Sequence, residues 1–154
     1  MKRVVITGMG IYSCIGRNQE EVKESLFQGK SGIGIAPARK ENGLFLGVNR
    51  SCRTPDLKKL LDRKKRHSLP SRENTAYMAT LEAFRQARIE ERFLLENEVG
   101  ILYGNDSSAA PVIQAIDIIR EKKNTALVGS GSIFQSMNST ITMNLSVYFP
   151  SKRN

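Results

Sequence analysis

The stretch KRVVITGMGI, residues 2–11, opens the chain with an uninterrupted apolar run that leads into two glycines one residue apart. Apolar runs without alternation are typical of strands that are buried on both faces of a parallel sheet. Gly8-Met9-Gly10 predicts a tight turn after this strand. A second run of the same kind, EVGILYG at residues 98–104, predicts a second buried strand and a small-residue loop after it.

The sequence between and beyond these two strands carries helical signals. A first helix is predicted from Gln19, with Asn18 as its N-cap, Glu21 completing a capping box and Gly29 at its C-terminal end. Further helices are predicted over residues 56–66, 71–88, 111–122 and 135–149, a short strand over residues 45–48, and a loop over residues 125–132. Strands that alternate with helices favour an α/β layered fold.

Length and composition indicate one domain that spans residues 1–154. Hydrophobic residues make up 40% of the chain and charged residues 25%, which is ordinary for a globular domain with a hydrophobic core. No apolar run approaches the ~20 residues that a membrane helix needs. We therefore expect a cytoplasmic protein with no membrane partner.

Positive charge is concentrated in one part of the chain. The formal net charge is +9, and residues 50–72 hold nine lysines and arginines against two aspartates. Such a field attracts an acidic partner, and nucleic acid, anionic lipid and an acidic protein are all candidates. The predicted basic helix is either a solvated face or a docking patch. It lacks interleaved aromatic residues and any nucleic-acid-binding signature, so no nucleic-acid partner is predicted.

Two glycine-containing motifs superficially resemble nucleotide-binding sites. After Gly8-Met9-Gly10 a dinucleotide fingerprint needs a third glycine where this chain has Ser13, and it needs a helix that begins at the turn. Gly29-Lys30-Ser31 resembles the end of a phosphate-binding loop, but Glu24 stands where the first glycine of that motif belongs. We therefore predict no nucleotide cofactor, and a nucleotide-binding α/β domain is kept only as an alternative.

The cysteines and the single histidine predict neither a metal centre nor a catalytic thiol. A zinc site needs about four ligands, whereas this chain offers Cys14, Cys52 and His67 at scattered positions. Two cysteines also do not make a disulfide framework. Cys14 has no neighbouring base to stabilise a thiolate, so we interpret it as a small buried hydrophobic residue. No catalytic residue and no metal ligand is predicted.

Four segments, taken in order, resemble one family. They are residues 2–11 with Ser13 and Gly16, then residues 29–33, 61–64 and 98–104. Together they are similar to the β-ketoacyl-acyl carrier protein synthases, the condensing enzymes of fatty-acid synthesis. The resemblance covers nearly the whole chain. It implies a thiolase-like α/β fold, of which this chain would form the incomplete N-terminal half.

The resemblance also implies a reaction and partners. In the family a cysteine at a helix N-terminus carries the acyl group, where the helix dipole favours its thiolate. Two histidines then stabilise the carbanion formed from malonyl-acyl carrier protein. The family pattern places all three residues beyond Asn154. We therefore expect the domain to end before the nucleophile, and the chain alone to be inactive. It would act as a homodimer or with a complementing C-terminal chain.

Basic residues of the predicted helix match the family's carrier-protein contacts. Arg63 and Lys64 match positions that contact the acidic carrier protein, and His67 falls where another basic residue often stands. Arg66 would project from the same helix end. The alternative to the condensing-enzyme hypothesis is a non-enzymatic carrier-protein-binding module that uses the basic helix at residues 58–66.

Three further residues match the family's acyl pocket. Ser107 matches a position that borders the pocket, where its small side chain leaves room for substrate. Phe134 and Met137 fall in a stretch that closes the pocket of the neighbouring subunit in the family dimer. The alternative for this stretch is ordinary core packing.

Overall fold

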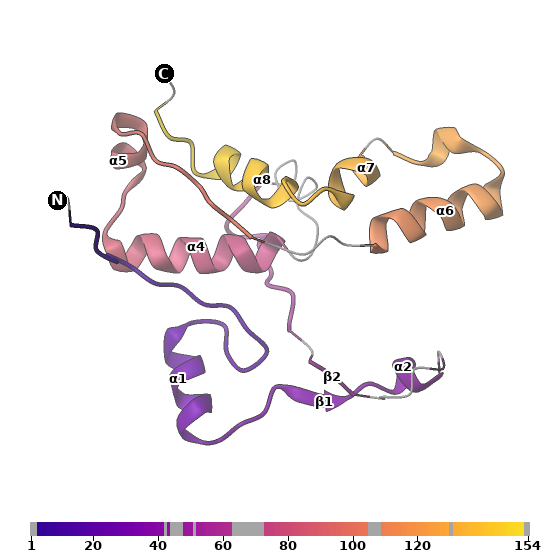
Figure 1. Cartoon of the computed structure of the whole chain (residues 1–154), viewed down its shortest axis with the longest axis horizontal. Coiled ribbons are helices and arrows are strands. Elements are labelled where there is room, and N and C mark those ends of the chain that lie inside the picture. Colours follow the sequence, from indigo (N-terminus) through magenta and orange to yellow (C-terminus); the bar gives the residue numbers. More distant parts are fainter. Residues whose placement is uncertain are drawn as a thin grey trace. The chain divides into compact units, whose positions relative to one another are not determined.

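The computed structural model describes residues 3–41, 43, 48–50, 52–62, 73–104, 109–129 and 131–152. Within these residues the secondary structure is mainly helical, with one two-stranded sheet (Figure 1). The chain divides into two compact units. The first unit comprises Met1–Lys59 and Ser71–Glu90, and the second comprises Leu60–Pro70 and Glu91–Asn154.

The first unit contains a small hairpin and two longer helices. Its elements are α1 (Gln19–Phe27), β1 (Ile33–Ile35), α2 (Pro37–Glu41), β2 (Val48–Arg50) and α4 (Glu73–Ala87). The strands β1 and β2 are antiparallel, with Gly34 opposite Asn49 at the centre of the register. The strand predicted at residues 45–48 therefore has its described part in β2, because residues 45–47 lie outside the described residues.

Helix α1 forms as its local sequence predicts. The Oδ1 atom of Asn18 accepts the backbone N–H of Glu21 at 2.8 Å, which confirms the N-cap. At the other end Gly29 has φ +62°, and the backbone N–H of Lys30 donates to the carbonyl oxygen of Ser25 at 2.8 Å. This is the Schellman arrangement in which glycine at C′ satisfies the last carbonyl groups of a helix.

The N-terminal segment is extended but does not form the predicted buried strand. Among the described residues no backbone ladder pairs with residues 3–12, so the strand prediction is wrong for this structure. The side chains of Val4, Val5 and Ile6 are 95%, 70% and 84% exposed. An apolar run gives strand propensity, but a strand also requires a partner for its N–H and C=O groups.

The two early glycines pack on α4 instead of forming a tight turn. A Cβ atom added to Gly10 would overlap the carbonyl oxygen of Ala79, and one added to Gly8 would lie 2.9 Å from the Cβ of Ala87. Both contacts are closer than a real Cβ atom can approach. The alanines of α4 and the glycines opposite them therefore allow the segment to lie directly against the helix.

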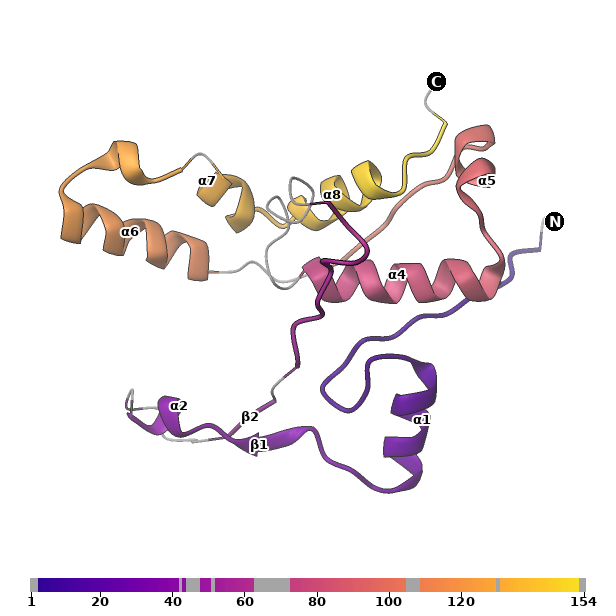
Figure 2. The same cartoon turned by 180° about the vertical axis from the view of Figure 1, so that it is seen from behind.

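The second unit is helical in its described part. Its elements are α5 (Glu91–Glu96), α6 (Ala110–Lys122), the 3₁₀ turn η1 (Thr125–Leu127), α7 (Gly131–Ser136) and α8 (Thr140–Tyr148). After α6 the chain reverses through η1, so that α7 lies beside α6 (Figure 2). Ile141 and Leu145, four residues apart on α8, are 7% and 3% exposed and provide much of this unit's small core.

Several predicted elements differ from the observed ones in the second unit. The helix predicted over residues 135–149 is observed as α8 and the last two residues of α7, and the predicted loop at residues 125–132 contains η1 and the first two residues of α7. The strand predicted at residues 98–103 is extended and unpaired in the described chain, with Leu102 fully exposed, so that prediction is also wrong. Helix α5 has no counterpart among the predictions.

The basic helix predicted over residues 56–66 is not seen in its described part. Residues 58–60 form a turn, and residues 63–72 lie outside the described residues. Of the three leucines in this segment, Leu57 and Leu61 are buried at 3% and 8% exposure, whereas Leu60 is 42% exposed. Of the helices that the structure describes, none combines the length and apolar character needed to cross a bilayer.

Candidate functional site

The corner between α7 and α8 holds the two described residues of the predicted acyl pocket. The carbonyl oxygen of Phe134 accepts the backbone N–H of Met137 at 3.0 Å and also the hydroxyl of Thr140. The N–H of Thr140 donates to the carbonyl oxygen of Met137 at 3.2 Å, and Thr140 itself is buried. These bonds end α7 and start α8 within one tight corner.

This corner leaves two large apolar side chains at the surface of the second unit. Phe134 is 52% exposed and Met137 is 49% exposed in this chain. Ser107, the third residue of the predicted pocket, lies outside the described residues. The structure therefore brings Phe134 and Met137 together and makes both available to a ligand or partner.

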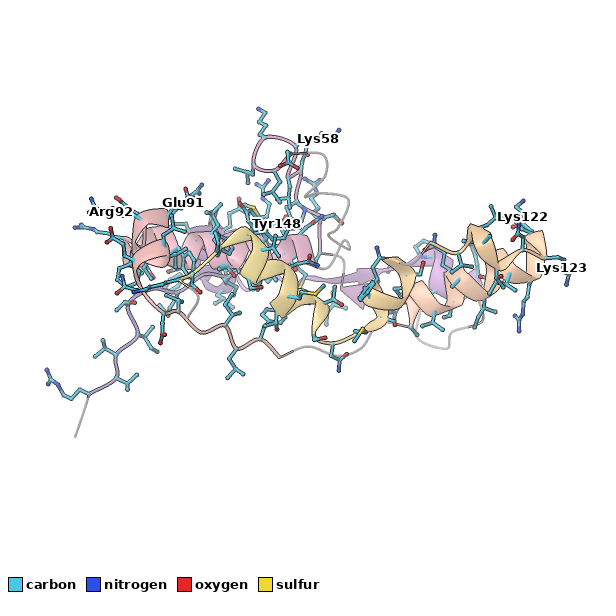
Figure 3. The ribbon with its side chains drawn as sticks, turned by 90° about the horizontal axis from the view of Figure 1, so that it is seen from above. Lys58, Glu91, Arg92, Lys122, Lys123 and Tyr148 are labelled. Carbon is cyan, nitrogen blue, oxygen red and sulfur yellow. The ribbon has the colours of Figure 1, made fainter. Side chains whose placement is uncertain are left out.

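The residues predicted to dock a carrier protein cannot be placed. Arg63, Lys64, Arg66 and His67 all lie outside the described residues. Just before them, Lys58 and Lys59 are exposed (Figure 3). The amide of Lys58 donates to Asp56 Oδ1 at 2.9 Å, which fixes the start of the turn that leads into this segment.

The cysteines lie in unremarkable surroundings. Cys14 is half-buried against Gly32, whose added Cβ would lie 2.9 Å from the Cβ of Cys14, and Cys52 is exposed. Among the residues that can be described, no group of histidine, cysteine and acidic side chains could hold a metal ion. Cys14 therefore fits its interpretation as a small packing residue, although it is only partly buried.

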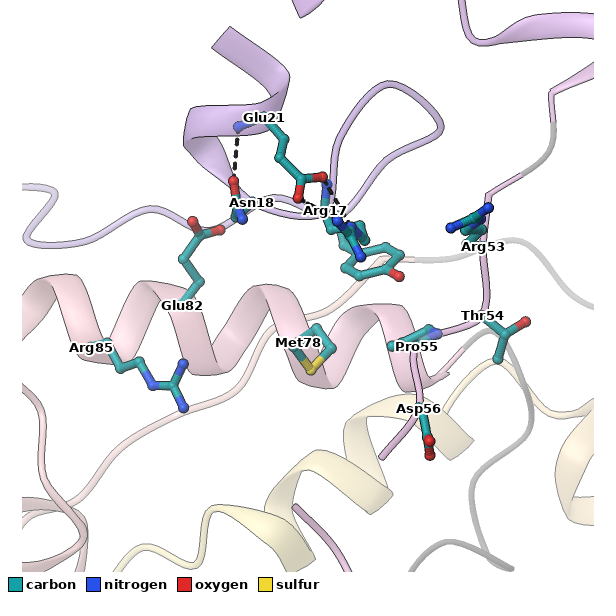
Figure 4. A pocket seen from close by; sticks show the side chains of 11 residues that line it. Arg17, Asn18, Glu21, Arg53, Thr54, Pro55, Asp56, Met78, Glu82 and Arg85 are labelled. Atoms are coloured by element: carbon teal, nitrogen blue, oxygen red, sulfur yellow. Dashed lines mark hydrogen bonds and ion pairs between the residues drawn. The ribbon is translucent and has the colours of Figure 1, made fainter. Parts of the chain in front are cut away.

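A polar cavity of about 550 Å³ in the first unit was not predicted from the sequence. Its walls come from the end of the N-terminal segment, the start of α1, the residues after β2 and one face of α4 (Figure 4). The lining side chains are Tyr12, Arg17, Asn18, Glu21, Arg53, Thr54, Pro55, Asp56, Met78, Glu82 and Arg85. These residues come from segments that lie far apart in the sequence, which explains why no sequence motif revealed the site.

One ion pair is built into the rim of this cavity. Arg17 Nη2 lies 2.8 Å from Glu21 Oε1, and Arg17 Nε lies 3.1 Å from both carboxylate oxygens of Glu21. The hydrogen bonds from Arg17 hold the pKa of Glu21 below its ordinary value. The backbone N–H of Arg17 also donates to Glu21, at 2.9 Å. The expected capping box is therefore displaced by one residue, because Glu21 reaches Arg17 instead of the N-cap Asn18.

The phenol of Tyr12 lies in the electrostatic field of this cluster. Partial burial is the main cause that raises the pKa of Tyr12, and a coulombic interaction with Cys52 adds to it, whereas Arg17 and Arg53 oppose the shift. The hydroxyl of Tyr12 is therefore a proton donor throughout the physiological pH range. The phenol of Tyr12 thus shares the lining of this cavity with three guanidinium groups, those of Arg17, Arg53 and Arg85.

Comparison with known proteins reveals what the whole chain resembles. The family described as "Beta-ketoacyl synthase, N-terminal domain" matches residues 1–152. The chain belongs to the β-ketoacyl synthase family. The structure superposes on a β-ketoacyl synthase from Burkholderia phymatum STM815 with a TM-score of 0.79 and 25% sequence identity, over 99% of this chain and 38% of that one. The expected thiolase-like fold is therefore confirmed for the N-terminal part of a ketosynthase.

Characterised relatives in the β-ketoacyl synthase family share one description. The chain is 31% identical to 3-oxoacyl-[acyl-carrier-protein] synthase 1 of Buchnera aphidicola subsp. Baizongia pistaciae over 151 residues. It is also 31% identical to the enzyme of that name from Escherichia coli strain K12 over 152 residues. In both cases 97% of this chain aligns with 37% of the relative. The shared region is thus the N-terminal third of a longer enzyme.

Proposed function

We propose that this chain supplies the N-terminal portion of a 3-oxoacyl-[acyl-carrier-protein] synthase that works in fatty-acid synthesis. The observation that carries the proposal is the family match over residues 1–152, together with 31% identity to named synthases across 97% of the chain. The reaction would be the decarboxylative condensation of an acyl thioester with malonyl-acyl carrier protein. The protein would act in the cytoplasm, where it meets its carrier protein.

The proposal assigns the covalent chemistry to residues outside this sequence. The family reaction needs one thiolate and two imidazoles, but this sequence contains a single histidine, His67, in its most basic segment. Neither Cys14 nor Cys52 stands at a helix N-terminus, where a thiolate would be stabilised. We therefore expect neither cysteine to act as the nucleophile. Condensation would need assembly with a complementing C-terminal chain that brings these groups, because a second copy of this chain would carry the same residues.

Two parts of this chain would contribute binding surfaces to that assembly. The basic segment with Arg63, Lys64, Arg66 and His67 would dock the acidic carrier protein by charge complementarity. Ser107, Phe134 and Met137 would form part of the wall of the acyl pocket. The exposed positions of Phe134 and Met137 at the α7–α8 corner support this second role, because an apolar acyl chain needs apolar surface to cover it.

Carrier-protein binding is the most direct test of the proposal. Fluorescence anisotropy would measure the dissociation constant of a labelled acyl carrier protein with the full chain at two salt concentrations. The proposal predicts binding that weakens at least about tenfold in an Arg63→Glu/Lys64→Glu double variant, because two attractive charges become repulsive.

A charge-matched control distinguishes docking from general attraction. Lys122 and Lys123 lie at the C-terminal end of α6, remote in sequence from the basic segment (Figure 3). A Lys122→Glu/Lys123→Glu variant changes the net charge by the same amount and should bind nearly as well as the parent chain. Equal losses in both double variants would contradict a specific docking site. Binding of duplex DNA but not of carrier protein, with steep salt dependence, would contradict the proposed function itself.

A further inference from the structure

The rim of the polar cavity in the first unit carries hydrogen-bond donors from separate segments of the chain. Arg17 precedes α1, Arg53 and Thr54 follow β2, and Tyr12 ends the N-terminal segment. Figure 4 shows Arg17 and Arg53 facing the same side of the cavity. Guanidinium, phenol and hydroxyl groups in this arrangement can all donate to one oxyanion.

The carboxylates of the same cavity are already engaged. Glu21 is held by Arg17. Both oxygens of Glu82 accept backbone amides, from Gln19 at 2.8 Å and from Ile11 at 2.9 Å. Asp56 accepts the amide of Lys58 at 2.9 Å. These acidic groups therefore stabilise the walls of the cavity and leave its remaining donors for a ligand.

Arg53 keeps its side-chain N–H donors available for a ligand. In the described part of the chain its side chain forms no ion pair, whereas the guanidinium of Arg17 is satisfied by Glu21 only on one edge, through Nε and Nη2. A guanidinium has five N–H donors, so Arg17 can bind Glu21 and still donate to a second anion. With Arg85, three arginines line the cavity against the three carboxylates of Glu21, Asp56 and Glu82, so the site would select its ligand by the donor geometry of Arg17 and Arg53 and not by a net positive charge.

We propose that Tyr12, Arg17 and Arg53 form a binding site for a phosphate monoester. A phosphate dianion matches two guanidinium groups from different segments better than a monoanionic carboxylate does, because it offers three terminal oxygens. The cavity volume of about 550 Å³ lies in the range of small-molecule sites, and Met78 and Pro55 provide apolar wall for the organic part of the ligand. This inference does not depend on the proposed condensation chemistry.

Glu21 has a specific place in this proposal. Its carboxylate competes with the phosphate for Arg17, so it acts as an internal substitute for the ligand when the site is empty. Replacement of Glu21 by glutamine removes the negative charge but keeps an acceptor for the backbone N–H of Arg17. We therefore expect Glu21→Gln to bind phosphate several-fold more tightly than the parent chain. A purely structural role for Glu21 predicts no such gain.

The test uses isothermal titration of the full chain with phenyl phosphate in a phosphate-free buffer, with benzoate as a carboxylate comparator. The expected result is one site per chain that prefers phenyl phosphate, with affinity lowered about tenfold or more by Arg53→Gln and by Arg17→Gln. Tyr12→Phe, which removes only the hydroxyl, should weaken binding to a smaller extent. Far-UV circular dichroism would establish that each variant is folded. Arg53→Gln is the substitution that should disturb folding least, because Arg53 is exposed in the segment after β2.

Arg92→Gln is the matched control for Arg17→Gln. Arg92 and Glu96 form an exposed ion pair of the same i, i+4 spacing, 2.7 Å long, on α5 in the other unit. Arg92→Gln should leave the affinity unchanged. The proposal is overturned if phenyl phosphate does not bind, if benzoate binds as tightly, if Arg53→Gln and Arg17→Gln bind like the parent chain, or if Arg92→Gln loses as much affinity as they do.

Discussion

The carboxylate of Glu82 on α4 accepts the backbone N–H of Gln19, the first residue of α1, at 2.8 Å. Its other oxygen accepts the N–H of Ile11 in the N-terminal segment at 2.9 Å. One side chain thus joins three segments of the first unit. It also places a negative charge at the positive end of the α1 dipole, which is favourable.

Loss of Glu82 should destabilise the first unit. Glu82→Ala leaves two backbone N–H groups without their charged acceptor, and we expect the free energy of unfolding to fall by about 2 kcal/mol. Urea unfolding followed by circular dichroism measures this change, and hydrogen exchange should accelerate at the amides of Gln19 and Ile11. Glu90→Ala, at an exposed site of the same unit, should change the free energy of unfolding by less than about 0.5 kcal/mol. Equal effects from both substitutions would refute the role given to Glu82.

Gly10 should not tolerate a side chain. The Cβ atom of Gly10→Ala would overlap the carbonyl oxygen of Ala79 and would lie 2.9 Å from the amide nitrogen of Ala83. We expect a cost of about 1–3 kcal/mol, which is typical of overpacking against backbone that cannot move freely. Gly34→Ala is the control, because a Cβ at Gly34 would meet no atom within 4 Å. A Gly10→Ala variant as stable as Gly34→Ala would show that the N-terminal segment does not lie on α4 as described.

The C-terminal ends of α1 and α4 offer a paired test of backbone strain. Gly29 after α1 and Arg88 after α4 both adopt left-handed conformations, with φ +62° and +56°. The N–H of Ile89 donates to the carbonyl oxygen of Phe84 at 2.9 Å, so α4 ends in the same motif as α1 but without glycine. Arg88→Gly should raise the free energy of unfolding by about 1 kcal/mol, and Gly29→Ala should lower it by a similar amount. Urea unfolding measures both changes. A lower free energy of unfolding in Arg88→Gly and a higher one in Gly29→Ala would contradict both assignments.

The ion pair at the rim of the cavity should be visible in a titration. Arg17 lowers the pKa of Glu21 from its ordinary 4.5. Because the folded-state pKa is the lower one, the stabilising contribution is present above pH 4.5 and is lost as the pH falls through the folded-state value. Carboxyl carbon NMR should show a pKa below 4.5 for Glu21, and Arg17→Gln should return it toward 4.5. Arg92→Gln should not shift it, and an unchanged Glu21 titration in Arg17→Gln would rule out the pair in solution.

The parts of the fold that sequence could predict are those with local causes. Helix α1 follows from an N-cap at Asn18 and a glycine at the C′ position Gly29, and both signals lie within the helix and its flanks. The alanines of α4 likewise leave room for close packing, and Gly8 and Gly10 lie against them. Capping and steric fit act over a few residues, so they can be recognised without knowledge of the tertiary structure.

The parts that sequence missed depend on partners distant along the chain. The apolar runs at residues 2–7 and 98–103 have strand propensity, but a strand exists only where another strand pairs with it. In the N-terminal segment the amides of Met9 and Ile11 donate instead to Gln86 and Glu82 of α4. Likewise, the cavity joins Tyr12, Arg17 and Arg53 from segments that no motif connects.

The central claim follows from the proposed function: this member of the β-ketoacyl synthase family takes up no acyl group on either of its own cysteines. Intact-mass spectrometry after incubation of the purified chain with an excess of acyl-acyl carrier protein tests it most directly. We expect the mass of the chain to remain unchanged, because neither Cys14 nor Cys52 stands at a helix N-terminus, where a thiolate would be favoured. A stoichiometric acyl adduct on either cysteine, lost in the corresponding alanine variant, would contradict the claim.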